Sequence, residues 1–239
     1  MAGVSDPATT YTNYLKIEEL LDLQQPRSDE HDEMLFVVIH QVYELWFKQI
    51  LWEFDHAVGL LDADDVVRAG HTLNRVLRIL KVLVSQLDVL ETMTPLEFLS
   101  FRDRLESASG FQSAQFRQLE QRLGLVDGDG PELWPALLRL LGRRGHAKDA
   151  GAADGAEVGD DSVRAMLVDV YRTDAPAAEL CERYVDLDEG VQEWRYRHLK
   201  MVQRTIGTRG GTGGSDGAEY LATTIRPAFP ALWAIRTEL

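Results

Sequence analysis

The chain has 239 residues, a length that fits one large domain or two small ones. Its 25 Lys and Arg residues against 39 Asp and Glu residues give a formal net charge of −14, which argues against a nucleic-acid partner and against docking on anionic lipid. The single cysteine, Cys181, excludes an internal disulfide framework and every multi-cysteine metal site. No apolar run approaches the roughly 18 residues of a membrane span, and the first residues lack signal-peptide features, so we expect a cytoplasmic protein.

Helical periodicity runs through most of the chain and predicts an all-α fold in a single domain spanning 1–239. The first predicted helix covers 13–23. Residues 33–61 are apolar around most of the helix circumference, which predicts a helix buried on several sides, and 65–92 carry a broad apolar face. Pro95 opens a shorter helix, because proline is tolerated in the first turn. Further helices are predicted over 112–123, 131–142, 162–171, 175–184 and 187–206.

Two segments lack helical periodicity. Residues 145–161 are rich in Gly, Ala and Asp and predict a mobile surface loop. Residues 207–217 contain six glycines but match neither phosphate-binding glycine motif, since they leave a helix instead of entering one. They are either a flexible surface linker or a loop that holds a small carboxylate, because glycines allow close backbone approach and Thr212 and Ser215 offer hydroxyls.

Two histidines lie in the middle of apolar helical segments. The ordinary interpretation is a structural role, with His40 satisfied by a neighbour such as Glu44. A polar imidazole on an apolar helix face nevertheless needs a partner that the face does not provide. An iron porphyrin is such a partner, since it is an apolar disc whose metal takes a neutral imidazole nitrogen. The residues alone leave open whether haem is bound, and whether His40 or His198 would bind the iron.

Arg102 lies in the aromatic-rich segment FLSFRD. A guanidinium between aromatic rings could bind a carboxylate with two parallel hydrogen bonds. The alternative is a surface ion pair with Asp103 or Glu106.

Four stretches of the sequence resemble the tryptophan 2,3-dioxygenase family. The N-terminal stretch is YTNYLKIEELLDLQ at 11–24, and the second is DEMLFVVIHQVYELWFKQILWEFD at 32–55. The others are LETMTPLEFLSFRDRLESASGFQSAQFRQLE at 90–120 and WRYRHLKMVQRTIGTRGGTGGSDGAEYL at 194–221. The resemblance covers most of the chain and fails mainly in 124–190.

This resemblance implies an all-helical protein that encloses haem b, with ferrous iron in the active state. Members of the family are usually homotetramers. They insert both atoms of O₂ across the indole C2–C3 bond of L-tryptophan and release N-formylkynurenine. The implied partners are therefore L-tryptophan or a related indole amino acid, O₂ and further copies of the chain.

The resemblance also implies roles for individual residues. His198 corresponds to the axial ligand of the haem iron, and His40 to the histidine that hydrogen-bonds the substrate's indole N–H. Phe36 corresponds to a residue that packs against the indole. Arg102 corresponds to the arginine that binds the substrate carboxylate, and Thr212 to the threonine that contacts its ammonium and carboxylate groups.

Further matches involve the loop beside the haem and the start of the chain. Ser109 and Gly110 correspond to the loop that lies beside haem and substrate. Tyr11, Tyr14 and Leu15 correspond to N-terminal residues that reach into the pocket of a neighbouring subunit.

The sequence departs from the family pattern at two positions. Phe98 replaces a tyrosine found in some members, which removes one hydroxyl from the carboxylate end of the substrate site. Asp216 replaces a small serine; its charge would repel a carboxylate if it pointed inward and would matter little in solvent.

Two alternative functions stay open. A haem monooxygenase would add one oxygen atom to tryptophan or a substituted tryptophan in secondary metabolism. A non-catalytic haem sensor would not need the amino-acid clamp, yet Arg102 and Thr212 are both present.

Overall fold

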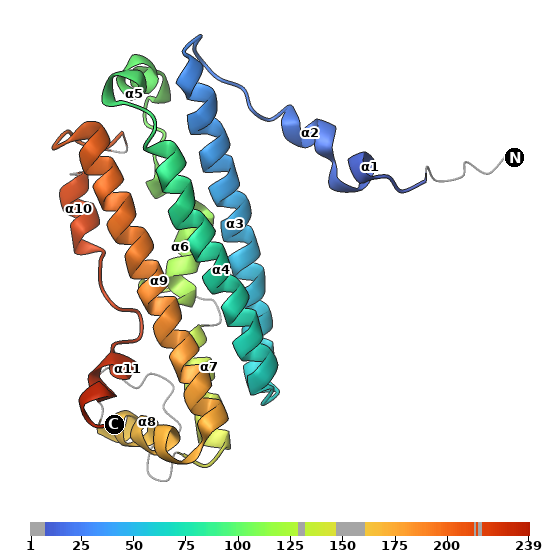
Figure 1. The fold of residues 1–239 in the computed structure, drawn as a ribbon, viewed down its shortest axis with the longest axis vertical. Helices are drawn as coiled ribbons and strands as arrows, with labels where there is room; N and C mark the ends of the chain where they lie inside the picture. The colour runs from blue at the N-terminus through green and yellow to red at the C-terminus, as the bar shows by residue number, and fades with distance from the viewer. Residues whose placement is uncertain (1–7, 129–131, 147–160, 213, 215–216) are drawn as a thin grey trace, which may run out of the picture.

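Three long helices lie side by side and form the body of the protein (Figure 1). The structure, a computed structural model, describes residues 8–128, 132–146, 161–212, 214 and 217–239, and the regular elements in this part of the chain are all helices. The long helices are α3 (His31–Asp62), α4 (Val66–Leu90) and α9 (Ala175–Ile206), and α4 packs against both of the others. The predicted all-α fold is confirmed.

The α3–α4 hairpin contains a short turn and an ion pair whose carboxylate is buried. Asp64 adopts a left-handed backbone conformation (φ 59°), and the side chain of Asp65 caps α4 by accepting from the backbone N–H of Arg68. Further along, the buried carboxylate of Glu53 on α3 accepts two 2.8 Å hydrogen bonds from Arg75 on α4. These contacts fix the relative positions of the two helices, because a buried carboxylate is costly unless it is paired.

The third long helix is continuous, so the break predicted between 175–184 and 187–206 was wrong. No proline or glycine interrupts Val185-Asp186, and Val185 and Leu187 are both buried against the bundle. Asp188, one residue further, is fully buried and accepts 2.9 Å hydrogen bonds from the backbone of Phe229 and the indole of Trp233. This carboxylate therefore attaches the C-terminal segment to α9.

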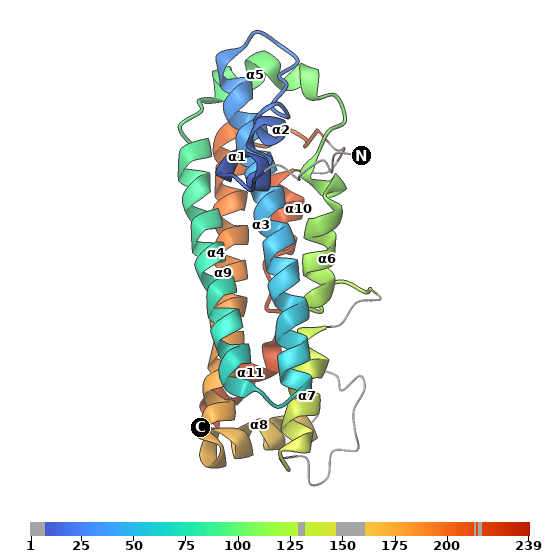
Figure 2. The same cartoon turned by 90° about the vertical axis from the view of Figure 1, so that its right-hand side faces the viewer.

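Shorter helices cover the bundle and close its ends (Figure 2). Helices α6 and α7 pack against α3, while α8, α10 and α11 pack against α9. At the upper end in both views, α5 lies over the start of α3 and the end of α9. The bounds are α5 Pro95–Phe101, α6 Ala114–Arg122, α7 Leu133–Arg143, α8 Asp161–Thr173, α10 Ala218–Thr223 and α11 Pro230–Ala234, with single 3₁₀ turns η1 Arg102–Leu105, η2 Gly110–Gln112 and η3 Ile235–Thr237.

The N-terminal residues form an arm that extends away from the bundle (Figure 1). It consists of α1 (Tyr11–Leu15) and α2 (Ile17–Leu21), and neither helix has a buried residue. The single helix predicted over 13–23 was wrong, because Lys16 adopts a left-handed conformation (φ 55°) and separates the two. The arm is attached to the bundle at its far end, where the Glu33 side chain accepts backbone hydrogen bonds from two residues ahead of α3.

Within the described residues, no helix has both the length and the apolar character that crossing a membrane requires. Most of the loop predicted at 145–161 lies outside the described residues, as do Ser215 and Asp216.

Candidate functional site

The two histidines singled out in the sequence lie on α3 and α9, in parts of the two helices that contact each other. His198 is partly exposed by surface area but closely surrounded by protein atoms, and this desolvation lowers the pKa of its imidazole to about 4. His40 is the second cause of this decrease, and Tyr43, three residues after His40, contacts Trp194, four residues before His198. The fold therefore brings together two residues that are far apart in the sequence.

His198 has a ring environment suited to a metal ligand. Its imidazole stacks in parallel on the indole of Trp194, one turn earlier on α9, with ring centroids 5.5 Å apart and planes 2° apart. Among the described residues, none makes a hydrogen bond to either of its ring nitrogens. A neutral imidazole with an available nitrogen lone pair in apolar surroundings is what haem iron binds, so the residues present fit a haem group.

His40 is fixed as one tautomer by the backbone. Its Nδ1 lies 2.7 Å from the carbonyl oxygen of Phe36, and a carbonyl can only accept, so Nδ1 carries the hydrogen. His40 is exposed by surface area, yet protein atoms lie close around its ring, and this desolvation lowers its pKa, which favours the neutral ring and leaves Nε2 as a hydrogen-bond acceptor. The partner suggested by the sequence, Glu44, instead accepts a 2.8 Å hydrogen bond from Gln115.

An aromatic wall stands beside His40. The Phe36 ring lies 4.0 Å from the His40 ring by centroid distance and 5.9 Å from the ring of Phe98 on α5. Phe101, which is fully buried, contacts both phenylalanines at 5.7 and 5.5 Å. The structure thus places Phe36 and Phe98 next to each other. It also places Phe101 beside both, and the i, i+3 spacing of Phe98 and Phe101 could have indicated that these two rings lie on one helix face.

The glycine-rich loop after α9 is tied to the segment after α5 by two hydrogen bonds. Arg102 donates from Nη2 to the carbonyl oxygen of Gly210 at 2.6 Å, and Thr212 donates from its hydroxyl to the carbonyl oxygen of Ala108 at 2.7 Å. The surface pairing of Arg102 with Asp103 or Glu106 is not observed; the carboxylate of Glu106 lies 4.0 Å from the guanidinium of Arg27.

The acceptors of the Arg102 and Thr212 hydrogen bonds are both backbone carbonyls. No side-chain pattern in the sequence could have indicated them, because every residue has such a carbonyl.

Ser109 and Gly110 lie next to this contact. The Ser109 side chain caps η2 by accepting from the backbone N–H of Phe111 at 3.4 Å. A Cβ atom placed on Gly110 would meet no heavy atom within 4 Å, so the backbone there borders open space. The ring of Phe111 contacts Tyr220 of α10 at 4.9 Å, which links this turn to the helix behind the glycine-rich loop.

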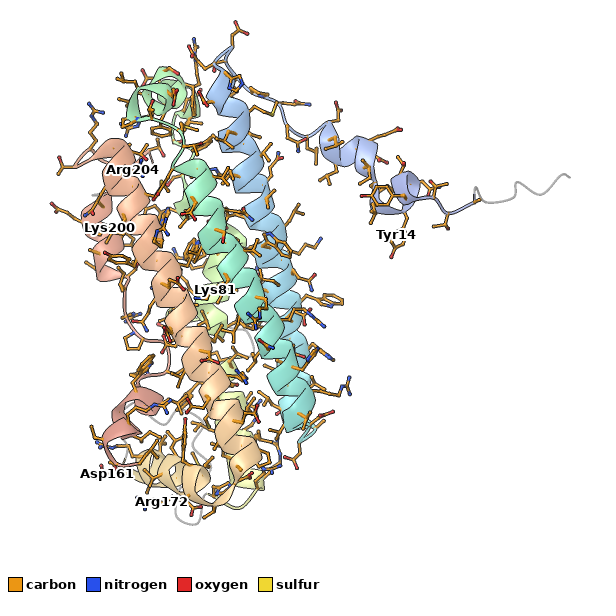
Figure 3. All side chains as sticks on the ribbon, in the orientation of Figure 1. Tyr14, Lys81, Asp161, Arg172, Lys200 and Arg204 are labelled. Atoms are coloured by element: carbon orange, nitrogen blue, oxygen red, sulfur yellow. The ribbon has the colours of Figure 1, made fainter. Side chains whose placement is uncertain are left out.

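Three of the predicted site residues do not reach the rest of the site within one chain. Tyr11 and Tyr14 are 75% and 74% exposed, and Leu15 is 44% exposed. Figure 3 shows Tyr14 on the arm, well away from the bundle.

Fold and site together define a protein whose described part is built of helices, with two histidines of lowered pKa, an aromatic wall and an arginine toward one end of the bundle. The profile of the family described as tryptophan 2,3-dioxygenase matches residues 2–129 and 152–239. The chain belongs to the tryptophan 2,3-dioxygenase family.

Individual relatives agree with this assignment along nearly the whole chain. The chain is 52% identical to a tryptophan 2,3-dioxygenase of Herpetosiphon aurantiacus, covering 97% of this chain and 99% of the relative. Identity is 54% to that of Anaeromyxobacter sp. strain K, with 97% of each chain covered. It is 43% to that of Caulobacter vibrioides, with 96% and 98% covered.

Proposed function

We propose that this protein, acting as one domain, binds haem b through His198 and inserts both atoms of O₂ across the indole C2–C3 bond of L-tryptophan, giving N-formylkynurenine. Membership of the tryptophan 2,3-dioxygenase family supports the reaction. The single structural observation that carries the proposal is the imidazole of His198: desolvation lowers its pKa to about 4, and none of the described residues hydrogen-bonds either of its ring nitrogens.

When bound, ferrous haem supplies the binding and activation of O₂. His40 orients the substrate, because its Nε2 accepts the hydrogen bond of the indole N–H while Nδ1 stays on the Phe36 carbonyl. The rings of Phe36 and Phe98 pack against the indole and exclude water from it.

Arg102 and Thr212 hold the amino-acid end of the substrate. A guanidinium has five N–H donors, so Arg102 can bind a carboxylate through the others while Nη2 stays on Gly210. The hydroxyl of Thr212 donates to the Ala108 carbonyl, which leaves its oxygen lone pairs to accept a hydrogen bond from the ammonium group. Positioning of this kind is the chief contribution of the protein to a cofactor-dependent reaction.

The exposed arm supports an oligomer, and we propose a homotetramer. Tyr11, Tyr14 and Leu15 are large apolar residues on α1, a helix without buried residues. Inserting them into the site of a neighbouring chain would bury this surface and complete the substrate site with residues from two chains.

The mass of the product tests the proposed reaction. The purified protein is titrated with haem without oxygen, and O₂ and L-tryptophan are then added while absorbance and product mass are followed. We expect a product that carries two added oxygen atoms, and His198→Ala should not form it. One added oxygen would support the monooxygenase alternative, and haem binding without any product would support the sensor.

A further inference from the structure

The indole of Trp194 lies between His198 and a tyrosine of α3. One face of Trp194 stacks on the imidazole of His198, with the two ring planes 2° apart. The indole Nε1–H donates a 3.4 Å hydrogen bond to the hydroxyl of Tyr43. That hydroxyl in turn donates a 2.5 Å hydrogen bond to the carbonyl oxygen of Leu83 on α4. One continuous series of contacts therefore joins all three long helices to the His198 ring.

Packing leaves the Trp194 indole little freedom. Phe47 of α3 meets it edge-on at 6.3 Å with planes 90° apart, and Phe116 of α6 lies 5.2 Å away. Tyr43 is buried, and burial raises the pKa of its hydroxyl to about 12, so the hydroxyl keeps the proton that it donates to Leu83. Among the described residues, the Tyr43 hydroxyl is the only group that accepts a hydrogen bond from the Trp194 indole N–H.

We propose that Tyr43 is a positioning residue for haem ligation: through Trp194 it fixes the rotation of the His198 imidazole about its side-chain bonds. The proposal rests on His198 being the haem ligand, as proposed above. Tyr43 contacts the indole of Trp194, and in this proposal it acts on the imidazole through that stacked indole.

The His198 imidazole has no hydrogen-bond partner among the described residues, so another contact must restrict its rotation. The terminal torsion of a histidine ring is broad, so without a partner the ring is free to turn. A parallel indole one turn earlier on the same helix restricts this rotation, because turning the imidazole would drive its edge into the indole face. The indole can restrict the imidazole only if it is itself held, and the Tyr43 hydroxyl provides its hydrogen bond.

Tyr184 offers a matched control on the same helix as His198. Its hydroxyl also donates to a backbone carbonyl, that of Leu133, at 2.9 Å, and its side chain is fully buried. It lies 14 residues before His198, which is about 21 Å along an α-helix. Tyr184→Phe therefore removes a buried tyrosine hydroxyl without touching the indole.

The first experiment needs no haem. The chain is labelled with ¹⁵N-tryptophan, and the signal of the Trp194 indole is assigned among the five tryptophans by its loss in Trp194→Phe. In Tyr43→Phe the indole N–H signal should move upfield and exchange with solvent faster, while in Tyr184→Phe it should stay in place. An unchanged signal in Tyr43→Phe would show that the hydrogen bond does not form and would overturn the proposal.

The second experiment measures the bond between iron and the His198 imidazole in the haem-loaded protein. In Tyr43→Phe the iron–histidine stretching band of the ferrous protein should shift and broaden, and haem transfer to an acceptor protein should be about 2- to 10-fold faster, the range expected for one lost hydrogen bond. Tyr184→Phe should match the wild-type protein in both. Trp194→Phe keeps an aromatic ring but loses the N–H, so it should behave like Tyr43→Phe. It replaces Tyr43→Phe in both measurements if that variant does not fold.

The outcomes separate this inference from the proposed function. If the wild-type protein shows the iron–histidine band, and His198→Ala loses it, but both Tyr43→Phe and Trp194→Phe keep it unchanged, the positioning role is wrong and the haem site stands. If the wild-type protein shows no such band, the haem ligation itself is wrong and the inference falls with it. A loss of thermal stability alone, equal in Tyr43→Phe and Tyr184→Phe, would also overturn the positioning role.

Discussion

Arg102 donates a hydrogen bond to the carbonyl oxygen of Gly210, a residue 108 positions later in the sequence. Thr212 donates a hydrogen bond in the opposite direction, from the loop after α9 to the carbonyl oxygen of Ala108. Two hydrogen bonds therefore connect the segment after α5 with this loop. A site assembled in this way before its ligand arrives loses less conformational entropy on binding. The same contact limits where the Arg102 guanidinium can point.

The first prediction concerns this guanidinium. Arg102→Lys keeps the charge but loses the planar donor group, so kcat/KM for L-tryptophan should fall about 10- to 100-fold, equivalent to roughly 1.5–3 kcal/mol for a hydrogen bond to a charged group. Haem binding, read by absorbance, should not change. Arg104→Lys, on the same 3₁₀ turn and exposed, is the matched control and should keep wild-type kinetics. Equal kinetics in both variants would contradict the assignment.

The second prediction is that His198 holds the haem iron. His198→Ala should fold, because it removes no hydrogen bond to the described residues, but it should lose the absorbance of histidine-ligated haem and all turnover. Circular dichroism checks the fold. His71→Ala removes an exposed histidine from α4 and should retain both haem and activity. A normal haem spectrum in His198→Ala would refute the ligand assignment.

The third prediction is that His40 orients the indole without ligating iron. His40→Ala should retain haem and lose rate by a factor equivalent to one hydrogen bond, roughly 1–3 kcal/mol. Because the pKa of His40 is lowered from 6.5, the neutral acceptor form should persist at pH 6.5 and be lost only at lower pH. The pH dependence of kcat/KM measures this. Loss of haem from His40→Ala would mean that the histidine is a ligand instead.

Much of this fold could be predicted from the sequence, because apolar periodicity directly reflects burial. The long helices α3 and α4 agree with the predicted 33–61 and 65–92 to within two residues at each end. The break in the predicted C-terminal helices and the single N-terminal helix were wrong. The left-handed conformation of Lys16 could not be predicted, since lysine has no special preference for it.

The site was only partly predictable for a different reason. Periodicity placed His40 and His198 on helices but could not show that the helices bring them together, since that depends on tertiary packing. The resemblance named Arg102 and Thr212, yet their partners are backbone carbonyls, which no side-chain pattern marks. The Trp194–His198 pair did have a signal, the i, i+4 spacing of two rings on one helix.

The fourth prediction concerns stability at the opposite end of the bundle. Asp174 caps α9 by accepting from the Ala177 N–H and also accepts hydrogen bonds from Arg144 and His146. The Arg144 guanidinium is the largest cause that lowers the pKa of Asp174, from 3.8 to about 2. A lowered carboxyl pKa stabilises the fold above pH 3.8, and this stabilisation is lost as the pH falls toward 2.

Urea unfolding across this pH range measures the contribution of Asp174. At pH 7, Asp174→Asn should reduce the free energy of unfolding by about 2 kcal/mol, and the difference from wild type should shrink as the pH falls below about 4. Asp29→Asn removes an exposed carboxyl group and should change neither the free energy of unfolding at pH 7 nor its pH dependence. A difference that stays constant with pH would show that the carboxylate's charge is not responsible.

The last prediction concerns the arm, whose exposed residues should complete the site of another chain. Substituting Tyr14 and Leu15 together by alanine should remove nearly all turnover while haem stays bound, whereas Leu96→Ala, which truncates a 79%-exposed leucine on α5, should not lower turnover. Light scattering should give a tetramer for the wild-type protein. If the arm instead packs on its own chain, the double variant should lose stability without a change in oligomeric state.

Mixing two defective chains tests the sharing directly. One chain carries Arg102→Ala and the other the double arm variant, and each alone should be inactive or nearly so. In a random mixture, about one quarter of the sites should combine an intact Arg102 from one chain with an intact arm from the other, because each half is intact with a chance of about one half. Activity should therefore rise to about a quarter of the wild-type value after the chains are unfolded and refolded together. A mixture no more active than its separate parts, or a wild-type protein that is a fully active monomer, would refute the shared site.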